Sequence, residues 1–379
     1  MPVSALQSPL ERRGKVEASR ADPVQPAKFK IRDSALQLSL ATRQLSTMMA
    51  SGLTIVRCLQ VLGNQPENIE VSQVFNYLTG LIEQGNRLSH ACAQCPRVFS
   101  PVYVGLIQVG EASGQLTTCL NQLTVVLERD YQVRRQLRSA LTYPAFVVGV
   151  ATLLVMLIFY VIMPNFVTIF RDLDMPMPVL TRILMWLTDA LRSPGFWLFL
   201  AGAILLTYQW VTRTWASPTG RVFLYSRLLA LPLFGKIFQV GTLSRYCVVM
   251  HAMLDQGVDL LLSVHLAAQA SGNPVLMADS SRFKDSLTNG VSLSSYMAAR
   301  SELYPPVLRQ MVLAGEEASS VADNFQKVGF FLNEELNHRM GLFNSLIEPV
   351  LMFGVGTTIG TIALAIMLPL YAYLGKLGS

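Results

Sequence analysis

The chain has little charge. Of its 379 residues only 14% are Asp, Glu, Lys or Arg, whereas 51% are hydrophobic, and the mean hydropathy is positive. Soluble domains usually carry charge on about a quarter of their residues. The scarcity of charge excludes an ordinary soluble protein and indicates a membrane protein.

Motifs of nucleotide and hydrolytic chemistry are also missing. The sequence has no Gly-rich loop ending in Gly-Lys-Ser or Gly-Lys-Thr, no Gly-x-Ser-x-Gly elbow and no His-Glu-x-x-His pair. It therefore lacks the usual cradle for a triphosphate, the usual serine nucleophile and the usual zinc site. We expect no enzymatic activity, no cofactor and no bound nucleic acid, so a partner must power any work.

Cysteines are few, and only Cys92 and Cys95 form a Cys-x-x-Cys pair. This pair could be half of a zinc site or a redox pair, but the sequence offers no second pair and its four histidines are scattered. The alternative, two small partly buried side chains, fits the spacing better. We expect no metal site.

Three long stretches lack any ionised side chain: residues 145–170, 195–212 and 350–375. A helix needs about 20 apolar residues to cross a bilayer, so each stretch predicts a transmembrane helix, although the middle one is the shortest and contains Gln209. Their lack of charge argues against a small-solute transporter, which is the main alternative function. A membrane-bound enzyme is a third class, disfavoured by the missing catalytic motifs.

The second half of the chain repeats the first at a constant offset. Gly110-Glu111 recurs as Gly315-Glu316 (315 − 110 = 205), and Pro164 recurs as Pro369. Within each copy the apolar residues follow helical spacing, and a predicted transmembrane segment ends the copy. The sequence thus predicts an all-α membrane protein with two tandem-repeat helical-bundle domains, each of about six helices, and three transmembrane helices.

The repeat also predicts the topology. Two copies that lie in one compartment need an additional span between them, and residues 195–212 lie where that span is required. Arg129 and Arg134 precede the first span, and Arg213 and Arg221 follow the second. Because cytoplasmic flanks are rich in Arg and Lys, we expect both repeats on the cytoplasmic side.

The segment from Gly110 to Leu116 predicts a corner between two helices. Gly114 can adopt a backbone conformation that other residues avoid, and Ser113 can cap the helix that begins near Leu116. In the second copy Ser319 takes the place of Gly114, so we expect the second turn to differ.

The same corners carry acidic residues in both copies. Glu111 and Glu316 could support the corner, or they could instead contact a partner protein or bind a cation. We take the residues of the corners as candidates for partner contact: Glu111, Ser113, Gly114, Glu316 and Glu317.

Gly356 and Gly360 in the last predicted span form a small-xxx-small pattern. Such a pattern allows close approach of another membrane helix, either from a second chain or from the same chain. We name both glycines as helix-packing candidates. Pro164 and Pro369, near the ends of the first and last spans, are expected to kink or end those helices.

Five short motifs together resemble those of a known family. They are Gly-Glu-x-Ser-Gly-x-Leu at 110–116, Leu-x-Tyr-Pro at 141–144, Met-Pro-Met-Pro-x-x-Thr-Arg at 175–182, Leu-Pro-Leu-Phe-Gly at 231–235 and Ile-Glu-Pro at 347–349. With them the sequence resembles, over nearly its whole length after residue 32, the inner-membrane platform proteins of type IV pilus and type II secretion machines, the PilC/GspF family.

The resemblance implies a non-enzymatic platform in the cell inner membrane that couples a cytoplasmic hexameric ATPase to assembly or retraction of pilin or pseudopilin subunits. It also implies contact with other inner-membrane assembly proteins, with the lipid bilayer and with further copies of the chain. The chain departs from the family at Val248, where the second copy usually has a basic residue. The type of machine, whether motility pilus, DNA-uptake pilus or secretion system, stays open.

With this topology the chain divides into eight segments. The basic tail has no apolar core, so we do not interpret it as a cleaved signal peptide. The predicted segments are a disordered cytoplasmic tail (1–32), a first cytoplasmic helical domain (33–142), transmembrane helix 1 (145–170), a short periplasmic loop (171–194), transmembrane helix 2 (195–212), a linker (213–242), a second cytoplasmic helical domain (243–345) and transmembrane helix 3 (350–375).

Overall fold

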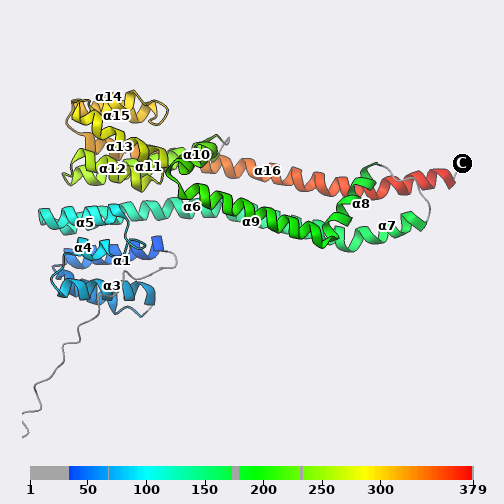
Figure 1. Ribbon diagram of the computed structural model, residues 1–379, viewed down its shortest axis with the longest axis horizontal. Coiled ribbons are helices and arrows are strands. Elements are labelled where there is room, and N and C mark those ends of the chain that lie inside the picture. Colours follow the sequence, from blue (N-terminus) through cyan, green and yellow to red (C-terminus); the bar gives the residue numbers. More distant parts are fainter. Residues whose placement is uncertain (1–33, 67, 173–178, 231–233, 378–379) are drawn as a thin grey trace, which may run out of the picture.

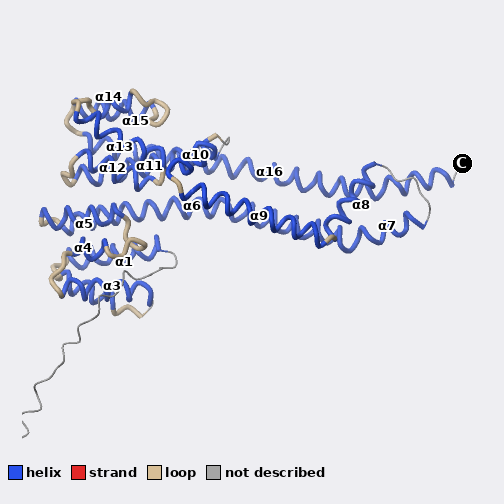
Figure 2. Tube along the Cα trace, in the orientation of Figure 1, coloured by secondary structure: helices blue, strands red, loops and turns tan. Residues whose placement is uncertain are grey.

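The protein is helical throughout the part of the chain that its structure describes. The computed structural model describes residues 34–66, 68–172, 179–230 and 234–377, and within these ranges it contains helices and no strand (Figure 2). The predicted fold class, two tandem helical repeats with three long apolar helices, is confirmed. The tail and parts of two family motifs, at 175–178 and 231–233, lie outside the described residues.

Each repeat contains six helices within the described ranges. The first repeat comprises α1 (Ser34–Ala50), α2 (Ile55–Gly63), α3 (Ile69–Glu83), α4 (Leu88–Ala93), α5 (Pro101–Ser113) and α6 (Leu116–Leu157). The second comprises α11 (Phe234–Asp255), α12 (Leu260–Ser271), α13 (Pro274–Thr288), α14 (Leu293–Ala298), α15 (Pro306–Glu317) and α16 (Val321–Leu377). Between them lie a π-helical segment (Ile158–Ile162), α7 (Met163–Asp172), α8 (Val179–Arg192), α9 (Pro194–Ala216) and α10 (Pro218–Leu229).

The duplicated sequence forms the same local structure twice because its capping residues recur. Thr54 caps α2 and Asp259 caps α12, each through a side-chain oxygen that accepts backbone N–H groups. Asn68 and Asn273 cap α3 and α13 in the same way. An N-cap satisfies amides that the first turn of a helix leaves without partners, so these pairs fix equivalent helix starts in both copies.

The two repeats stack on one another at one end of an elongated molecule (Figure 1). Within them α1 packs along α6 and α11 along α16, while α5 and α6 lie against α12 and α11 of the second repeat. Apolar side chains of both repeats join one buried core. Polar contacts cross the interface: Asp130 pairs with Arg245 at 3.3 Å, and the Gln122 amide donates to Asp255 at 3.0 Å.

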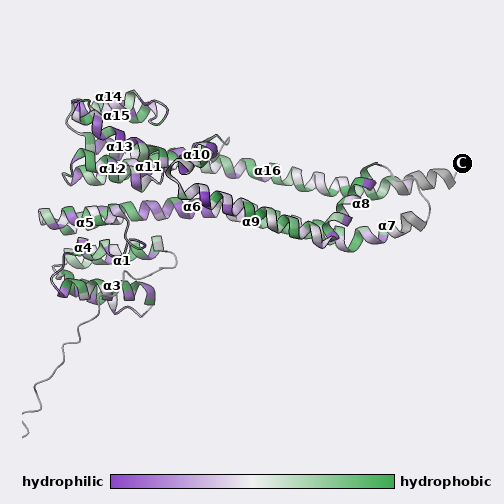
Figure 3. Cartoon of the chain, viewed as in Figure 1, coloured by the Kyte–Doolittle hydropathy of each residue, from purple (hydrophilic) through white to green (hydrophobic). Residues whose placement is uncertain are grey.

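Three helical stretches are long and apolar enough to cross a membrane: Thr142–Phe166, Pro194–Ala216 and a part of Val321–Leu368. Hydrophobic residues cover α9 and much of α16 where they extend away from the repeats (Figure 3). The first and last stretches begin inside α6 and α16, which run from repeat to membrane segment without a break. The domain limits near 142 and 345 therefore stay predictions, since no change of secondary structure marks them.

Two segments predicted as connections are largely helical. The predicted loop at 171–194 includes α8, and the predicted linker at 213–242 includes α10 and the beginning of α11. In α8 the apolar side chains fall on one face, and Leu184 is buried against Phe159, Met163 and Ala365. An amphipathic helix is stable when its apolar face packs on another apolar surface. For α8 that surface includes α16, which is distant in sequence, so the segment alone did not indicate a helix.

The two prolines do not end their helices. Pro164 follows the π-helical segment, a widened turn that accommodates a residue without an N–H. The helix then continues as α7, and α16 likewise continues beyond Pro369 to Leu377. Of the two expected effects, an end of the helix is wrong for both prolines, and a kink stays a prediction.

Candidate partner-contact site

The carboxylate of Glu111 holds the beginning of α4. Its Oε1 accepts the backbone N–H of Leu88 at 2.6 Å and of Ser89 at 3.3 Å, and its Oε2 accepts the Ser89 hydroxyl at 2.5 Å. The residue at the N-cap, Arg87, makes no side-chain capping bond. Glu111 thus supplies from α5 the capping acceptor that α4 lacks, and its negative charge suits the positive end of a helix.

Glu316 does the same in the second repeat. Its Oε1 accepts the backbone N–H of Leu293 at 2.8 Å and of Ser294 at 3.3 Å, at the beginning of α14. Leu293 is the counterpart of Leu88 (88 + 205 = 293). Both carboxylates are therefore engaged in intramolecular hydrogen bonds, which supports the structural interpretation of the corner.

The glycine before each glutamate allows two helices to meet closely. A Cβ added to Gly110 would lie 2.9 Å from Cα of Leu116, and one added to Gly315 would lie 2.9 Å from Cα of Val321. Real Cβ atoms do not approach other carbons so closely. Glycine is required here because α5 and α6, and likewise α15 and α16, touch at this point.

The two turns share a left-handed residue but differ in where the helix ends, because α5 ends at Ser113 whereas α15 ends at Glu317, one position before the counterpart of Ser113. Gly114 has φ 72° and Ser319 has φ 54°, so both lie in the left-handed region. Ser113 is not the N-cap of α6, which is Gln115, but its hydroxyl accepts the Gln115 N–H at 3.4 Å while it donates to the Val109 carbonyl at 2.9 Å. The close contact at Gly110 and Gly315 fixes the path of the chain through each turn. Ser319 therefore adopts a left-handed backbone conformation despite its steric cost.

The remaining candidates at the corners are exposed. Ser113, Gly114 and Glu317 all face solvent, whereas Glu111 and Glu316 are half-buried. α6 begins at Leu116 and its apolar stretch at Thr142, a separation of about 39 Å at the helical rise of about 1.5 Å per residue. The corners thus lie at the end of the molecule farthest from the apolar helices, and their exposed residues can reach a partner there.

The predicted helix-packing glycines have open space around them. A Cβ at Gly356 or Gly360 would meet no described atom within 4 Å. The neighbouring face of α16 instead forms a groove of about 300 Å³ with α6, lined mostly by small or β-branched side chains that include Thr152, Gly354 and Thr358. The two glycines are free to receive a helix from another molecule, and their contact with one stays a prediction.

Burial governs the chemistry of Cys92 and Cys95. Burial raises the pKa of the Cys92 thiol far above its usual range, and neighbouring Cys95 and Glu111 raise it further. A thiol that holds its proton is a poor nucleophile and a poor metal ligand. Within the described ranges no group of three metal-binding side chains occurs.

Sequence reasoning missed the contacts between the repeats. Asp130 and Arg245 are paired across the interface, but their counterparts in the other copy are Glu335 and Leu40, so the repeat carries no sign of the pair. Gly315 and Glu316 were found because they do repeat.

Comparison with known proteins places these features in a family. Residues 41–164 and 246–369 each match the family described as type II secretion system (T2SS), protein F. The type IV pilus assembly protein PilC of Thermus thermophilus is 30% identical over 380 residues, covering 97% of this chain and 92% of its own. PilC of Pseudomonas aeruginosa is 26% identical, with 89% of each chain covered, and its type II secretion system protein F is 25% identical, with 89% and 82% covered.

Proposed function

The chain belongs to the type II secretion system protein F family, and we propose that it is a membrane platform that couples a cytoplasmic hexameric ATPase to the movement of pilin or pseudopilin subunits. Family membership and the names of its relatives support a place in pilus or secretion machinery. The coupling itself is inferred from the geometry of α6 and α16.

The observation that carries this proposal is the continuity of these two helices. α6 has 42 residues and α16 has 57, which corresponds to about 63 Å and about 86 Å of unbroken helix. Each begins at an exposed corner of a repeat and continues as an apolar membrane helix. Helical structure continues without a break through Pro144 in α6 and Pro349 in α16, so a push or rotation of the corner is passed to the membrane segment, which is what a motor beneath the membrane requires.

A helix-breaking insertion tests the coupling. Four glycines inserted after Gly341, an exposed position of α16 before the apolar stretch, should abolish fibre assembly or secretion while the protein still enters the membrane and co-purifies with the ATPase. The same insertion after Gly290, in the exposed turn between α13 and α14, is the control and should leave assembly intact. Normal assembly by the α16 variant would disprove rigid coupling.

The membrane segments offer surface for a moving apolar helix. α9 has no buried side chain, and α6 and α16 leave a groove between them. A pilin that leaves the bilayer must keep its apolar helix away from water, because exposure of that surface is unfavourable. We infer that pilin helices pass along these surfaces.

We also infer that both repeats face the cytoplasm. This orientation agrees with their position at one end of the molecule (Figure 1) and with the arginines that flank the spans. The five native cysteines are free and buried, so single exposed cysteines can be introduced. In intact cells stripped of their outer membrane, an impermeant maleimide should label Ser193→Cys and not Ser113→Cys, and the reverse pattern would overturn the orientation.

A further inference from the structure

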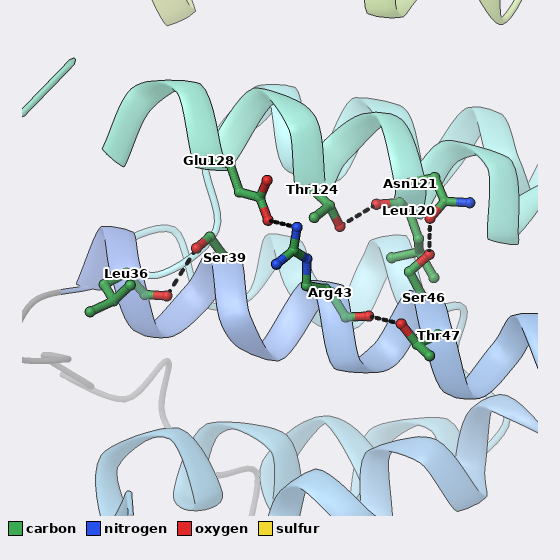
Figure 4. A network of polar contacts seen from close by, with 9 residues as sticks. All are labelled: Leu36, Ser39, Arg43, Ser46, Thr47, Leu120, Asn121, Thr124 and Glu128. Atoms are coloured by element: carbon green, nitrogen blue, oxygen red, sulfur yellow. Dashed lines mark hydrogen bonds and ion pairs between the residues drawn. The ribbon is translucent and has the colours of Figure 1, made fainter. Parts of the chain in front are cut away.

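In the first repeat, polar side chains close the seam between α1 and α6. Arg43 of α1 pairs with Glu128 of α6 at 2.9 Å, and the Ser46 hydroxyl donates to the Asn121 side chain at 2.6 Å (Figure 4). Thr124 fills the space between these contacts and donates to a backbone carbonyl. Polar side chains thus fill the space between α1 and α6 over the length drawn in Figure 4.

In the second repeat, shorter residues occupy the equivalent positions. Val248 replaces Arg43, Asn333 replaces Glu128 and Gly329 replaces Thr124, each at the offset of 205. The ion pair is absent and a pocket of about 610 Å³ lies there, between α11, α16 and the neighbouring α6 of the first repeat. Its volume is in the range of ligand sites, about 300 to 1,000 Å³, and such sites often lie at domain interfaces.

The charged side chains that line this pocket are basic. Arg129 comes from α6, Lys327 from α16 and His251 from α11, and no carboxylate lines the pocket. Among the described residues neither Arg129 nor Lys327 forms an ion pair, whereas Asp255 nearby accepts hydrogen bonds from Gln122 and Gln256. Unpaired cations at the walls of a pocket favour an anion.

His251 is oriented by its other ring nitrogen. Its Nδ1 lies 3.1 Å from the carbonyl oxygen of Ala322, and since a carbonyl can only accept, Nδ1 carries the proton. The Nε2 of His251 then accepts a hydrogen bond when the ring is neutral and donates one when it is protonated. This nitrogen can hold a phosphate hydroxyl or a phosphate oxygen.

The same pocket has an apolar wall. The side chain of Phe330 is 60% exposed and that of Val125 is 49% exposed, and both line the pocket beside Val248. Lipid does not cover them, because Asn333 precedes the start of the uncharged stretch at Val350 by 17 residues, or about 25 Å of helix. An exposed aromatic face next to unpaired cations suits a flat ring that carries an oxyanion.

We propose that the pocket between the two repeats binds a small ligand of the nucleotide class, with its phosphate between Arg129 and Lys327 and its ring against Phe330. Side-chain amides of Gln326 and Asn333 are placed to meet polar groups of the ring or sugar. The ligand is bound and not hydrolysed, because the chain has no phosphate-binding loop. Since both repeats contribute walls, the bound ligand holds them in one arrangement and stabilises their interface.

Calorimetric titration of the purified full-length protein in detergent tests this proposal with ADP, GDP, inorganic phosphate and adenosine as probes. We expect a nucleoside diphosphate to bind more tightly than phosphate or adenosine, to bind less tightly as salt rises, and to raise the thermal unfolding temperature. Equal affinity for phosphate and for both nucleotides would overturn the role of the ring. Failure of all four probes to bind would overturn the proposal.

Substitutions separate the two halves of the site. Lys327→Gln and Arg129→Gln should each weaken nucleotide binding by about tenfold to a hundredfold, the loss expected for one charged hydrogen bond. Phe330→Leu should weaken nucleotide binding and leave phosphate binding unchanged. Lys284→Gln, an exposed lysine of α13 outside the pocket, is the matched control and should bind as the unmodified protein does.

The first repeat supplies the decisive variant. Val248→Arg combined with Asn333→Glu recreates the ion pair of Arg43 and Glu128 and should fill the pocket while the helices stay packed. We expect this double variant to unfold at the same temperature as the unmodified protein, or higher, and to lose nucleotide binding. Binding that survives in this folded variant would place the ligand elsewhere and refute the assignment.

Discussion

The hydroxyl of Thr181 in α8 donates a hydrogen bond of 2.7 Å to the backbone carbonyl of Ala365 in α16. Ala365 lies four residues before Pro369, so its carbonyl is the one that a helical N–H at position 369 would normally satisfy. Proline has no N–H to give. Thr181 therefore satisfies the acceptor that Pro369 leaves open, which explains how α16 continues through the proline in a segment away from water.

This relationship predicts a coupled pair of substitutions. Thr181→Val should destabilise the protein by about 1 kcal/mol, the usual size of a hydrogen bond between membrane helices. In a Pro369→Ala background the new N–H satisfies Ala365, so the same threonine substitution should cost much less. Thermal unfolding of the four proteins in detergent measures the coupling.

Thr188→Val is the control for that cycle. Thr188 is also buried in α8, but its hydroxyl donates to the Leu184 carbonyl of its own helix. Its cost should be the same with either residue at position 369. Additive effects of Thr181→Val and Pro369→Ala would show that the threonine does not serve the open carbonyl.

The second repeat contains a buried polar cluster with no counterpart in the first. Asp279 is 3% exposed, pairs with Arg300 at 2.7 Å and accepts the hydroxyls of Tyr296 and Tyr304 at 3.0 Å. At the equivalent positions the first repeat has Val74, Ala91, Cys95 and Phe99. Four positions thus differ together between the two copies.

Removing one member of this cluster should cost far more than replacing all four. Asp279→Ala leaves the guanidinium of Arg300 and the hydroxyl of Tyr304 without their acceptor, whereas the Tyr296 hydroxyl keeps the backbone carbonyl of residue 279, and should destabilise by about 3 to 5 kcal/mol. The quadruple variant Asp279→Leu, Tyr296→Phe, Arg300→Met and Tyr304→Phe replaces the cluster with apolar side chains of similar volume and should cost little. Thermal unfolding checks both, and a quadruple variant less stable than Asp279→Ala would contradict the argument.

The same cluster predicts loss of stability in alkali. Burial raises the pKa of Tyr296 from 10.0 to about 12, and its hydrogen bond to Asp279 contributes. The folded state therefore holds the tyrosine proton more tightly than the unfolded state does. This stabilisation is complete below pH 10 and disappears as pH rises towards 12. Unfolding temperatures measured from pH 9 upward should fall less steeply in Tyr296→Phe.

The internal repeat explains which parts of this structure could be predicted. The recurrence of Gly110 as Gly315 predicted equivalent corners, and the caps Asn68 and Asn273 recur with it because they too act on neighbouring residues. The capping role of Glu111 was not visible, because its partners lie 22 and 23 residues away in sequence. α16 continues past Pro369 because Thr181 of another helix donates to the carbonyl of Ala365. No local sequence pattern reveals that hydrogen bond.

The two acidic residues at the second corner should separate stability from partner contact. Glu316→Gln weakens the cap of α14 and should destabilise by about 1 kcal/mol, as should Glu111→Gln for α4. Glu317→Lys changes an exposed charge and should leave unfolding unchanged while it reduces co-purification of the ATPase. If the Glu317→Lys variant co-purifies as much ATPase as the unmodified protein does, the second corner is not part of the surface that contacts the ATPase.

Gly356 and Gly360 provide the test of contact between membrane helices. Leucine at either position meets open space in the monomer, so Gly356→Leu and Gly360→Leu should insert and fold normally. If a helix of a second copy packs there, both variants should lose the oligomer seen by cross-linking in membranes and lose assembly, because the added side chains hold the backbones apart. Met352→Leu, a 72% exposed position of the same helix, should behave as the unmodified protein. If both glycine variants keep the oligomer, no helix of a second copy packs against Gly356 and Gly360.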